Sequence, residues 1–301
     1  MQSQAATTFR KPLSIKIYPT LAYIALLFVT FLFLYNFSSK YTVSHQKTIP
    51  PPTTIPITVT PVTSQSLYSQ PKIQQKQVYK ISLVGDSMTA ILGPHGGILS
   101  EYMNSLYKSP DEKVQRIIID NYAKSSNIQA IDSQLNQKTT VSEYTFGPLL
   151  ATSYDLILIE SFGYNPLSQY GTEEGIKEQN KKLDAVMQQI KEKSPNSLVV
   201  FVATLSPNLQ NYAQSTEPTS SVEQRAKQAS ERMLYIRNHI SYAKSHNIPL
   251  INIYEKSLTP YGDGDMKYIN ESDDIHPSEE GVEFISHEIG DYIFNKDILP
   301  H

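Results

Sequence analysis

Five short apolar runs constrain the fold of this chain more than any other feature of its sequence. Each run is almost continuously apolar rather than alternating, which is typical of strands that are buried on both faces. Stretches with helical spacing separate the runs, so the pattern predicts a three-layer α/β/α domain with a five-stranded, mainly parallel sheet. The runs are Lys80–Val84, Arg116–Ile119, Asp155–Ile159, Leu198–Ala203 and Pro249–Ile253.

Three of the intervening stretches predict helices with identifiable features. Thr172 is expected to cap a helix with Glu173 and Glu174 in its first turn, where acidic side chains oppose the positive end of the helix dipole. A last helix is expected from Ser278 to about Phe294. The longest helix is predicted from an apolar stripe at spacings of three and four residues: Val222, Ala226, Ala229, Met233, Ile236, Ile240 and Ala243.

An uncharged, apolar stretch at residues 17–39 predicts one transmembrane helix, because a bilayer span takes roughly 20 such residues. A cleaved signal peptide is the alternative. Its apolar region is usually about 7–15 residues long and is followed by small residues, whereas Tyr35-Asn36-Phe37 follows here. The sequence therefore favours an uncleaved anchor.

Three basic residues precede this stretch within one short tail, residues 1–16. The positive-inside rule then places residues 1–16 in the cytoplasm and everything after the span outside the membrane. Residues 40–77 are rich in Thr, Pro, Ser and Gln, so they predict a disordered stalk or spacer, and residues 78–301 form the predicted globular domain. The basic residues are Arg10, Lys11 and Lys16.

The composition excludes several kinds of chemistry. The chain has no cysteine, which rules out disulfides, thiolate metal ligands and thiol catalysis. A formal net charge of −3 gives no reason to expect a nucleic-acid partner. No His-Glu-x-x-His or comparable ligand set occurs, so we predict neither a metal nor a cofactor. The sequence does not indicate an oligomeric state.

Polar residues follow the predicted strands, at the edge of the sheet where open parallel sheets bind ligands. Ser87 follows the first strand and is the candidate nucleophile, which requires a base, a group that orients the base, and donors for an oxyanion. The four polar segments are Gly85-Asp86-Ser87, residues 121–126, residues 160–165 and residues 273–277. Each motif alone is common in turns, and what favours catalysis is their order and place.

In these segments the chain resembles the SGNH, or GDSL-type, hydrolase family, over essentially all of residues 78–301. Three blocks carry the resemblance: Gly85-Asp86-Ser87, Gly163-x-Asn165 and Asp273-x-x-His276. The resemblance implies a flavodoxin-like fold and a triad of Ser87, His276 and Asp273. It also implies an oxyanion hole built from the Ser87 backbone N–H, the Gly163–Asn165 block with its Asn165 amide, and a second-block backbone N–H.

The chain departs from the family pattern at two positions. The second-block position that is normally glycine is Ser126, whose backbone N–H serves only if its φ and ψ suit a residue with a Cβ. Pro166 stands where an aspartate commonly follows the third-block asparagine. Asp274 rivals Asp273 as the orienting acid, and His95 either lines the site or is a solvated loop residue.

These features together predict a membrane-anchored, extracytoplasmic serine esterase. The alternatives are an O-acyltransferase with the same triad and a cell-surface binding domain on a decayed hydrolase scaffold. The polar stretch Ser206–Ser221 and the absence of a long apolar lid favour short-chain acyl or acetyl esters, including carbohydrate-linked ones, as small-molecule or glycan substrates.

Overall fold

The computed structural model describes residues 68–108 and 115–301. The predicted transmembrane segment at 17–39 and most of the predicted linker at 40–77 lie outside these residues. Within the described ranges, every helix is too short or too polar to cross a membrane.

A five-stranded parallel sheet forms the centre of the domain, as the apolar runs predict. Its strand order is β2-β1-β5-β6-β7, the order of flavodoxin-like folds once the strands of this sheet are counted along the chain. Every residue of β5 and β6 is buried, which explains why these two runs contain almost no polar residue. The strands are β1 (Val78–Val84), β2 (Arg116–Asn121), β5 (Leu156–Glu160), β6 (Leu198–Ala203) and β7 (Leu250–Asn252).

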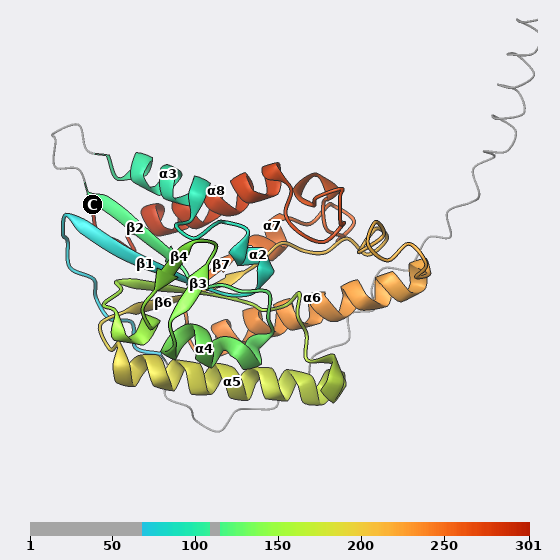
Figure 1. Cartoon of the computed structure of the whole chain (residues 1–301), viewed down its shortest axis with the longest axis horizontal. Helices are drawn as coiled ribbons and strands as arrows, with labels where there is room; N and C mark the ends of the chain where they lie inside the picture. The colour runs from blue at the N-terminus through green and yellow to red at the C-terminus, as the bar shows by residue number, and fades with distance from the viewer. Residues whose placement is uncertain (1–67, 109–114) are drawn as a thin grey trace, which may run out of the picture. The chain divides into compact units, whose positions relative to one another are not determined.

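Helices cover both faces of the sheet, which confirms the three-layer prediction (Figure 1). Helices α3 (Gly97–Leu106) and α8 (Glu279–Asn295) lie on one face, and α4 (Ile131–Asn136), α5 (Thr172–Lys193) and α6 (Val222–Ser245) lie on the other. Two short helices follow strands closely: α2 (Ser87–Ala90) comes after the turn that ends β1, and α7 (Ile253–Lys256) starts directly after β7. Single 3₁₀ turns occupy Ile128–Ala130, Leu149–Ala151, Ser168–Tyr170 and Met266–Tyr268.

The helix ends agree with the sequence prediction in one case and differ in another. Ser278 caps α8 by accepting a hydrogen bond from the Gly281 N–H, as expected. Thr172 does not cap α5, because it is already the first helical residue and Gly171 is the N-cap, with φ 72° and no side-chain hydrogen bond. A glycine reaches this backbone conformation without strain, so the chain enters the helix one residue earlier than the threonine predicts.

A two-stranded antiparallel hairpin, β3 (Thr139–Val141) and β4 (Tyr144–Phe146), was not predicted. Its strands are too short to show alternation, which needs at least four residues to be recognised. The His95 ring packs edge-on against Tyr144 and Phe146, with ring centroids 4.6 and 5.5 Å apart. His95 is thus a half-exposed residue that supports the hairpin.

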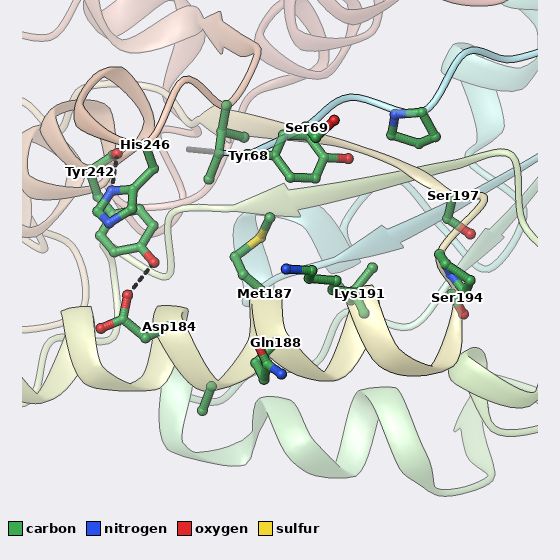
Figure 2. A pocket seen from close by; sticks show the side chains of 15 residues that line it. Tyr68, Ser69, Asp184, Met187, Gln188, Lys191, Ser194, Ser197, Tyr242 and His246 are labelled. Carbon is green, nitrogen blue, oxygen red and sulfur yellow. Dashed lines mark hydrogen bonds between the residues drawn. The ribbon is translucent and has the colours of Figure 1, made fainter. Parts of the chain in front are cut away.

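The end of the predicted linker contacts the domain. The Tyr68 N–H donates to the His246 carbonyl at 2.9 Å, and the Tyr68 hydroxyl accepts from the Val199 N–H at 2.8 Å. Tyr68, Ser69 and Pro71 border a cavity of about 820 Å³, which α5 and the end of α6 also line (Figure 2). In this cavity the Tyr242 hydroxyl donates to Asp184 at 2.6 Å. None of the predicted catalytic residues lines it.

Candidate active site

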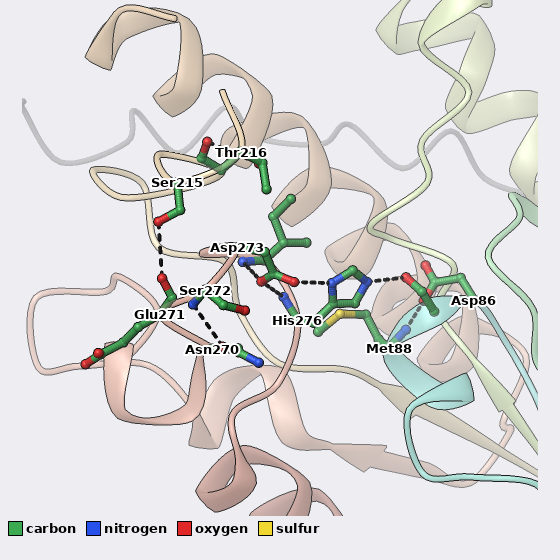
Figure 3. A network of polar contacts seen from close by, with 12 residues as sticks. Asp86, Met88, Ser215, Thr216, Asn270, Glu271, Ser272, Asp273 and His276 are labelled. Atoms are coloured by element: carbon green, nitrogen blue, oxygen red, sulfur yellow. Dashed lines mark hydrogen bonds and ion pairs between the residues drawn. The ribbon is translucent and has the colours of Figure 1, made fainter. Parts of the chain in front are cut away.

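The structure brings Ser87, His276 and Asp273 together at the carboxyl edge of the sheet, although Ser87 and His276 are 189 positions apart in the sequence. Figure 3 shows the Asp273 carboxylate facing the His276 ring. The Ser87 Oγ lies 3.0 Å from the His276 Nε2, and the His276 Nδ1 lies 2.7 Å from the Asp273 Oδ2. A carboxylate only accepts hydrogen bonds, so the Nδ1 carries the hydrogen and the neutral imidazole has its lone pair on Nε2. In that tautomer the ring can take the serine proton.

Asp273 is held by its own loop. Its Oδ1 accepts from the backbone N–H groups of Ile275 and His276, both at 2.9 Å, which leaves Oδ2 for the imidazole. Partial burial raises the pKa of Asp273, but the hydrogen bonds from the His276 ring and the two backbone N–H groups outweigh it and leave the pKa below its ordinary value. Asp273 is therefore ionised at neutral pH.

The rival carboxylate of Asp274 points away from the imidazole. Its backbone is in the left-handed region, with φ 57°, so its side chain departs from that of Asp273. Its Oδ2 accepts from both the N–H and the hydroxyl of Ser215, at 2.8 and 2.6 Å. Asp274 thus ties the loop after β6 to the loop that carries His276.

The corner that carries Ser87 is built around a buried aspartate. Asp86 has no exposed surface, and its Oδ1 caps α2 by accepting from the Met88 N–H at 2.9 Å. Gly85 is required at the turn, since a Cβ there would lie 2.8 Å from the Glu160 Cβ. The Gln134 side chain holds Gly85 from the other side, accepting from its N–H at 3.2 Å and donating to its carbonyl at 2.9 Å.

Asn165 is joined to this corner through its amide. The Asn165 Nδ2 donates to the Asp86 Oδ2 at 3.2 Å, and its second N–H is left for another acceptor. Its backbone N–H donates to the carbonyl of Phe162, which has φ 52°. Gly163 is needed for packing, because a Cβ there would lie 2.2 Å from the Ile236 Cγ1 on α6.

The serine at position 126, the first departure from the family pattern, does not strain the backbone. Ser126 is not among the described residues with positive φ, so its Cβ is accommodated without strain. Its loop reaches the nucleophile corner, where the Lys124 N–H donates to the Gly85 carbonyl at 3.2 Å. Beside Pro166, Asn165 takes its support from Asp86 and from the Phe162 carbonyl.

Sequence reasoning missed Gln134 at this corner, and it placed Glu160 in a polar segment without assigning it a role. Glu160 is buried at the end of β5, where its Oε2 accepts from the Asp86 N–H at 3.2 Å and its Oε1 accepts from the Ser161 hydroxyl. Burial, followed by the charge of Asp86, raises the pKa of Glu160 well above its ordinary value. The signal in the sequence is an acidic residue that ends an otherwise wholly apolar strand.

The described residues hold no group of three or more His, Cys, Asp or Glu side chains that could bind a metal ion. His239 on α6, for example, is buried alone and stacks on Phe201, with ring centroids 4.2 Å apart. Its Nε2 lies 3.2 Å from the Ile159 carbonyl, and burial lowers its pKa to about 3. His239 is therefore a neutral core residue.

A serine–imidazole–carboxylate chain at the carboxyl edge of a parallel sheet defines a class of hydrolase, and comparison with known proteins specifies the family. Residues 81–289 match the model of the GDSL-like lipase/acylhydrolase family. No curated protein matches the chain significantly by sequence. The chain belongs to the GDSL-like lipase/acylhydrolase family and is an esterase-type serine hydrolase.

The chain is similar to solved structures at low sequence identity. A GDSL-like lipase from Parabacteroides merdae is 15% identical, with a TM-score of 0.51 over 75% of this chain and 99% of that one. A lipase/acylhydrolase from Enterococcus faecalis is 16% identical, with a TM-score of 0.49 over 72% and 96% of the two chains.

Proposed function

We propose that Ser87 is the nucleophile of this esterase, with His276 as its general base and Asp273 as the residue that orients and stabilises the imidazole. The observation that carries the proposal is the chain of contacts at 3.0 and 2.7 Å from the Ser87 Oγ through the imidazole to the Asp273 carboxylate. The ionised state of Asp273 supports it, because the imidazolium formed during the reaction needs a negative partner.

The reaction proceeds in two halves. The Ser87 Oγ attacks the ester carbonyl carbon while its proton passes to the His276 Nε2, and the imidazolium then gives that proton to the departing alkoxide. Water repeats the sequence on the acyl-enzyme: its proton goes to Nε2, its oxygen attacks the acyl carbon, and the proton returns to the Ser87 Oγ as the acid leaves.

The oxyanion is held by donors from three loops. In the proposal these are the backbone N–H groups of Ser87 and Ser126 and the free N–H of the Asn165 amide. The Ser87 N–H lies at the start of α2, where the first N–H groups of a helix have no partner within the helix. Such donors act on charge that develops only in the transition state.

We infer that the substrate carries a short acyl group. Tyr164, beside Asn165, is buried, and it lies 6.3 Å from the buried Tyr212 ring, measured between ring centroids. Two bulky rings packed here support a small acyl site, and the polar stretch Ser206–Ser221 supports a polar alcohol such as a sugar. Esters of small molecules or glycans fit this combination.

We also propose that residues 17–39 anchor the chain in a membrane with the catalytic domain outside, on the strength of the uncharged span and the basic residues before it. Protease added to intact cells should release a fragment that begins between residues 40 and 67. A mature chain that already begins near residue 40 would show a cleaved signal peptide instead.

The full-length chain, extracted in mild detergent, tests the nucleophile. A fluorophosphonate probe should label the wild type and Ser230→Ala, which alters an exposed serine on α6, but not Ser87→Ala. Hydrolysis of p-nitrophenyl esters of increasing chain length should follow the same pattern and fall as the acyl chain grows. Labelling or hydrolysis that persists in Ser87→Ala would refute the proposed nucleophile.

A further inference from the structure

Two carboxyl groups lie buried against each other directly behind the nucleophile. Asp86 has no exposed surface and Glu160 is 2% exposed. They meet where the Asp86 N–H donates to the Glu160 Oε2 at 3.2 Å, and the two carboxyl groups influence each other's protonation. Neither takes part in any ion pair among the described residues.

The surroundings of Glu160 offer no charge to balance a second negative group. From β6, α7 and α8 the neighbouring side chains are apolar: Val202, Ile253 and Ile285. The polar neighbours Thr89 and Thr204 do not titrate at neutral pH. Tyr164, in the following loop, is the other titratable group that interacts with Glu160, and burial raises its pKa well above the ordinary value, so it stays neutral.

Two adjacent carboxylates without a cation cannot both be ionised in such a site, so the pair must hold one proton. Asp86 is the better place for the charge, because it accepts hydrogen bonds from the Met88 N–H and the Asn165 amide. Glu160 also accepts two hydrogen bonds, from the Asp86 N–H and the Ser161 hydroxyl, but its other neighbours are mainly apolar. Burial, together with the Asp86 charge, raises the pKa of Glu160 well above the ordinary value. Glu160 therefore keeps the proton.

We propose that Glu160 is a positioning residue that stays protonated at neutral pH and donates to Asp86, so that the Asp86 carboxylate holds the Asn165 amide in the oxyanion hole. The inference rests on the proposed function, because it assigns Glu160 a role through Asn165. It adds to the triad a buried acid that touches neither substrate nor imidazole and acts by fixing the direction of one donor.

Infrared difference spectroscopy tests the proton directly. The wild-type chain at pH 8 should show the C=O stretch of a protonated carboxylic acid, and this band should be absent from Glu160→Gln and present in Glu174→Gln, an exposed control on α5. A spectrum in which Glu160→Gln loses no such band would overturn the proposal. This measurement needs no catalysis, so it stands apart from any failure of the proposed function.

A double-mutant cycle tests the route through Asn165. Glu160→Met, which keeps the length but removes the donor, should lower kcat for p-nitrophenyl acetate by roughly 10–100-fold with KM nearly unchanged, since the oxyanion forms only in the transition state. In an Asn165→Ala background the same change should cost less than about threefold. Glu160→Gln, a neutral group that still donates, should stay within about threefold of the wild type.

Equal losses from Glu160→Met in both backgrounds would overturn the proposal, as would a loss in Glu160→Gln as large as in Glu160→Met. If Glu160→Met does not fold, the infrared band lost in Glu160→Gln still tests the proton, and a loss of kcat well beyond threefold in Glu160→Gln still overturns the proposed role. Fluorophosphonate labelling of Ser87 in the wild type distinguishes a failure of the proposed function from a failure of the role proposed for Glu160. Unlabelled Ser87 refutes the proposed function, whereas labelled Ser87 with an additive cycle refutes only the role of Glu160.

Discussion

Two pairs of side chains flank Ser87, and each contains an aspartate in the opposite environment. At the rim, Asp273 is 25% exposed and faces the imidazole of His276. Behind the nucleophile, Asp86 is sealed from solvent and faces Glu160. The rim pair combines a base with an acid and can move a proton, whereas the buried pair combines two acids and retains one. Partner and burial, rather than residue type, decide which of these roles an aspartate has.

The largest effect should come from the rim. Asp273→Asn should lower kcat by roughly 10⁴, because an amide favours the wrong imidazole tautomer and cannot stabilise the imidazolium. Asp274→Asn is the matched control at the next position and should cost far less, since its hydrogen bonds go to Ser215. Steady-state kinetics on a p-nitrophenyl ester measures both. Similar losses in the two variants would mean that the loop as a whole, rather than the Asp273 carboxylate, matters.

Asn165 is hydrogen-bonded to Asp86 of the buried pair and is the proposed oxyanion donor, so its loss should have an intermediate effect. Asn165→Ala removes one oxyanion donor and should lower kcat by roughly 10²–10³ with KM nearly unchanged. The measurement is again kcat and KM on the same ester. A loss below about threefold would assign the Gly163–Asn165 block a structural role only.

Stability should respond to pH with opposite signs at the two pairs. The pKa of Glu160 is raised in the folded protein. Its contribution to the free energy of unfolding is therefore fully present below the ordinary pKa of about 4.3 and is lost as pH rises. Glu160→Gln should therefore gain in melting temperature relative to the wild type, by a few degrees, between pH 4 and 7.

The pKa of Asp273 is lowered in the folded protein. Its contribution to the free energy of unfolding is therefore present above the ordinary pKa of about 3.9 and is lost as pH falls. The difference in melting temperature between wild type and Asp273→Asn should accordingly shrink below pH 4. Calorimetry across pH 3–8 follows both variants, and slopes of the same sign would contradict the contrast between the two pairs.

The smallest effect is expected at Ser126. Its proposed donor is a backbone N–H and its φ is not positive, so Ser126→Gly should keep kcat within about threefold of the wild type. Steady-state kinetics on the same p-nitrophenyl ester measures the kcat of this variant. A loss as large as that of Asn165→Ala would give the Ser126 hydroxyl, which lies 3.4 Å from the Lys124 carbonyl, a role in the reaction.

The sequence predicted the parts of the molecule that leave a strong local pattern. Continuous apolar runs such as Leu198–Ala203 identify central strands whatever their neighbours are, and the parallel sheet was confirmed. The cap of α5 was missed because Gly171 adopts a backbone conformation that a side-chain pattern does not reveal. The hairpin at residues 139–146 was missed because three-residue strands are too short to show a period.

In the candidate active site, too, the residues that belong to a local motif were predicted and those that depend on distant partners were not. Motif spacing named Ser87, Asp273 and His276, and the structure brings all three together. Their catalytic roles remain predictions. The spacing also favoured Asp273 over Asp274, but only the left-handed backbone of Asp274 explains why the second carboxylate turns away. Glu160 was placed in a polar segment but given no role, because its contact is with a partner 74 residues away that no local pattern connects to it.

The distance along the chain between Ser87 and His276 has a consequence for synthesis. The nucleophile corner emerges early, yet its base follows only after every strand of the sheet has been made, because His276 comes after β7. A chain still attached to the ribosome before that point holds a serine without a base and should be inert toward esters. Ester hydrolysis is then a signal of completed folding, and its appearance during refolding can time the docking of the last loop onto the first turn.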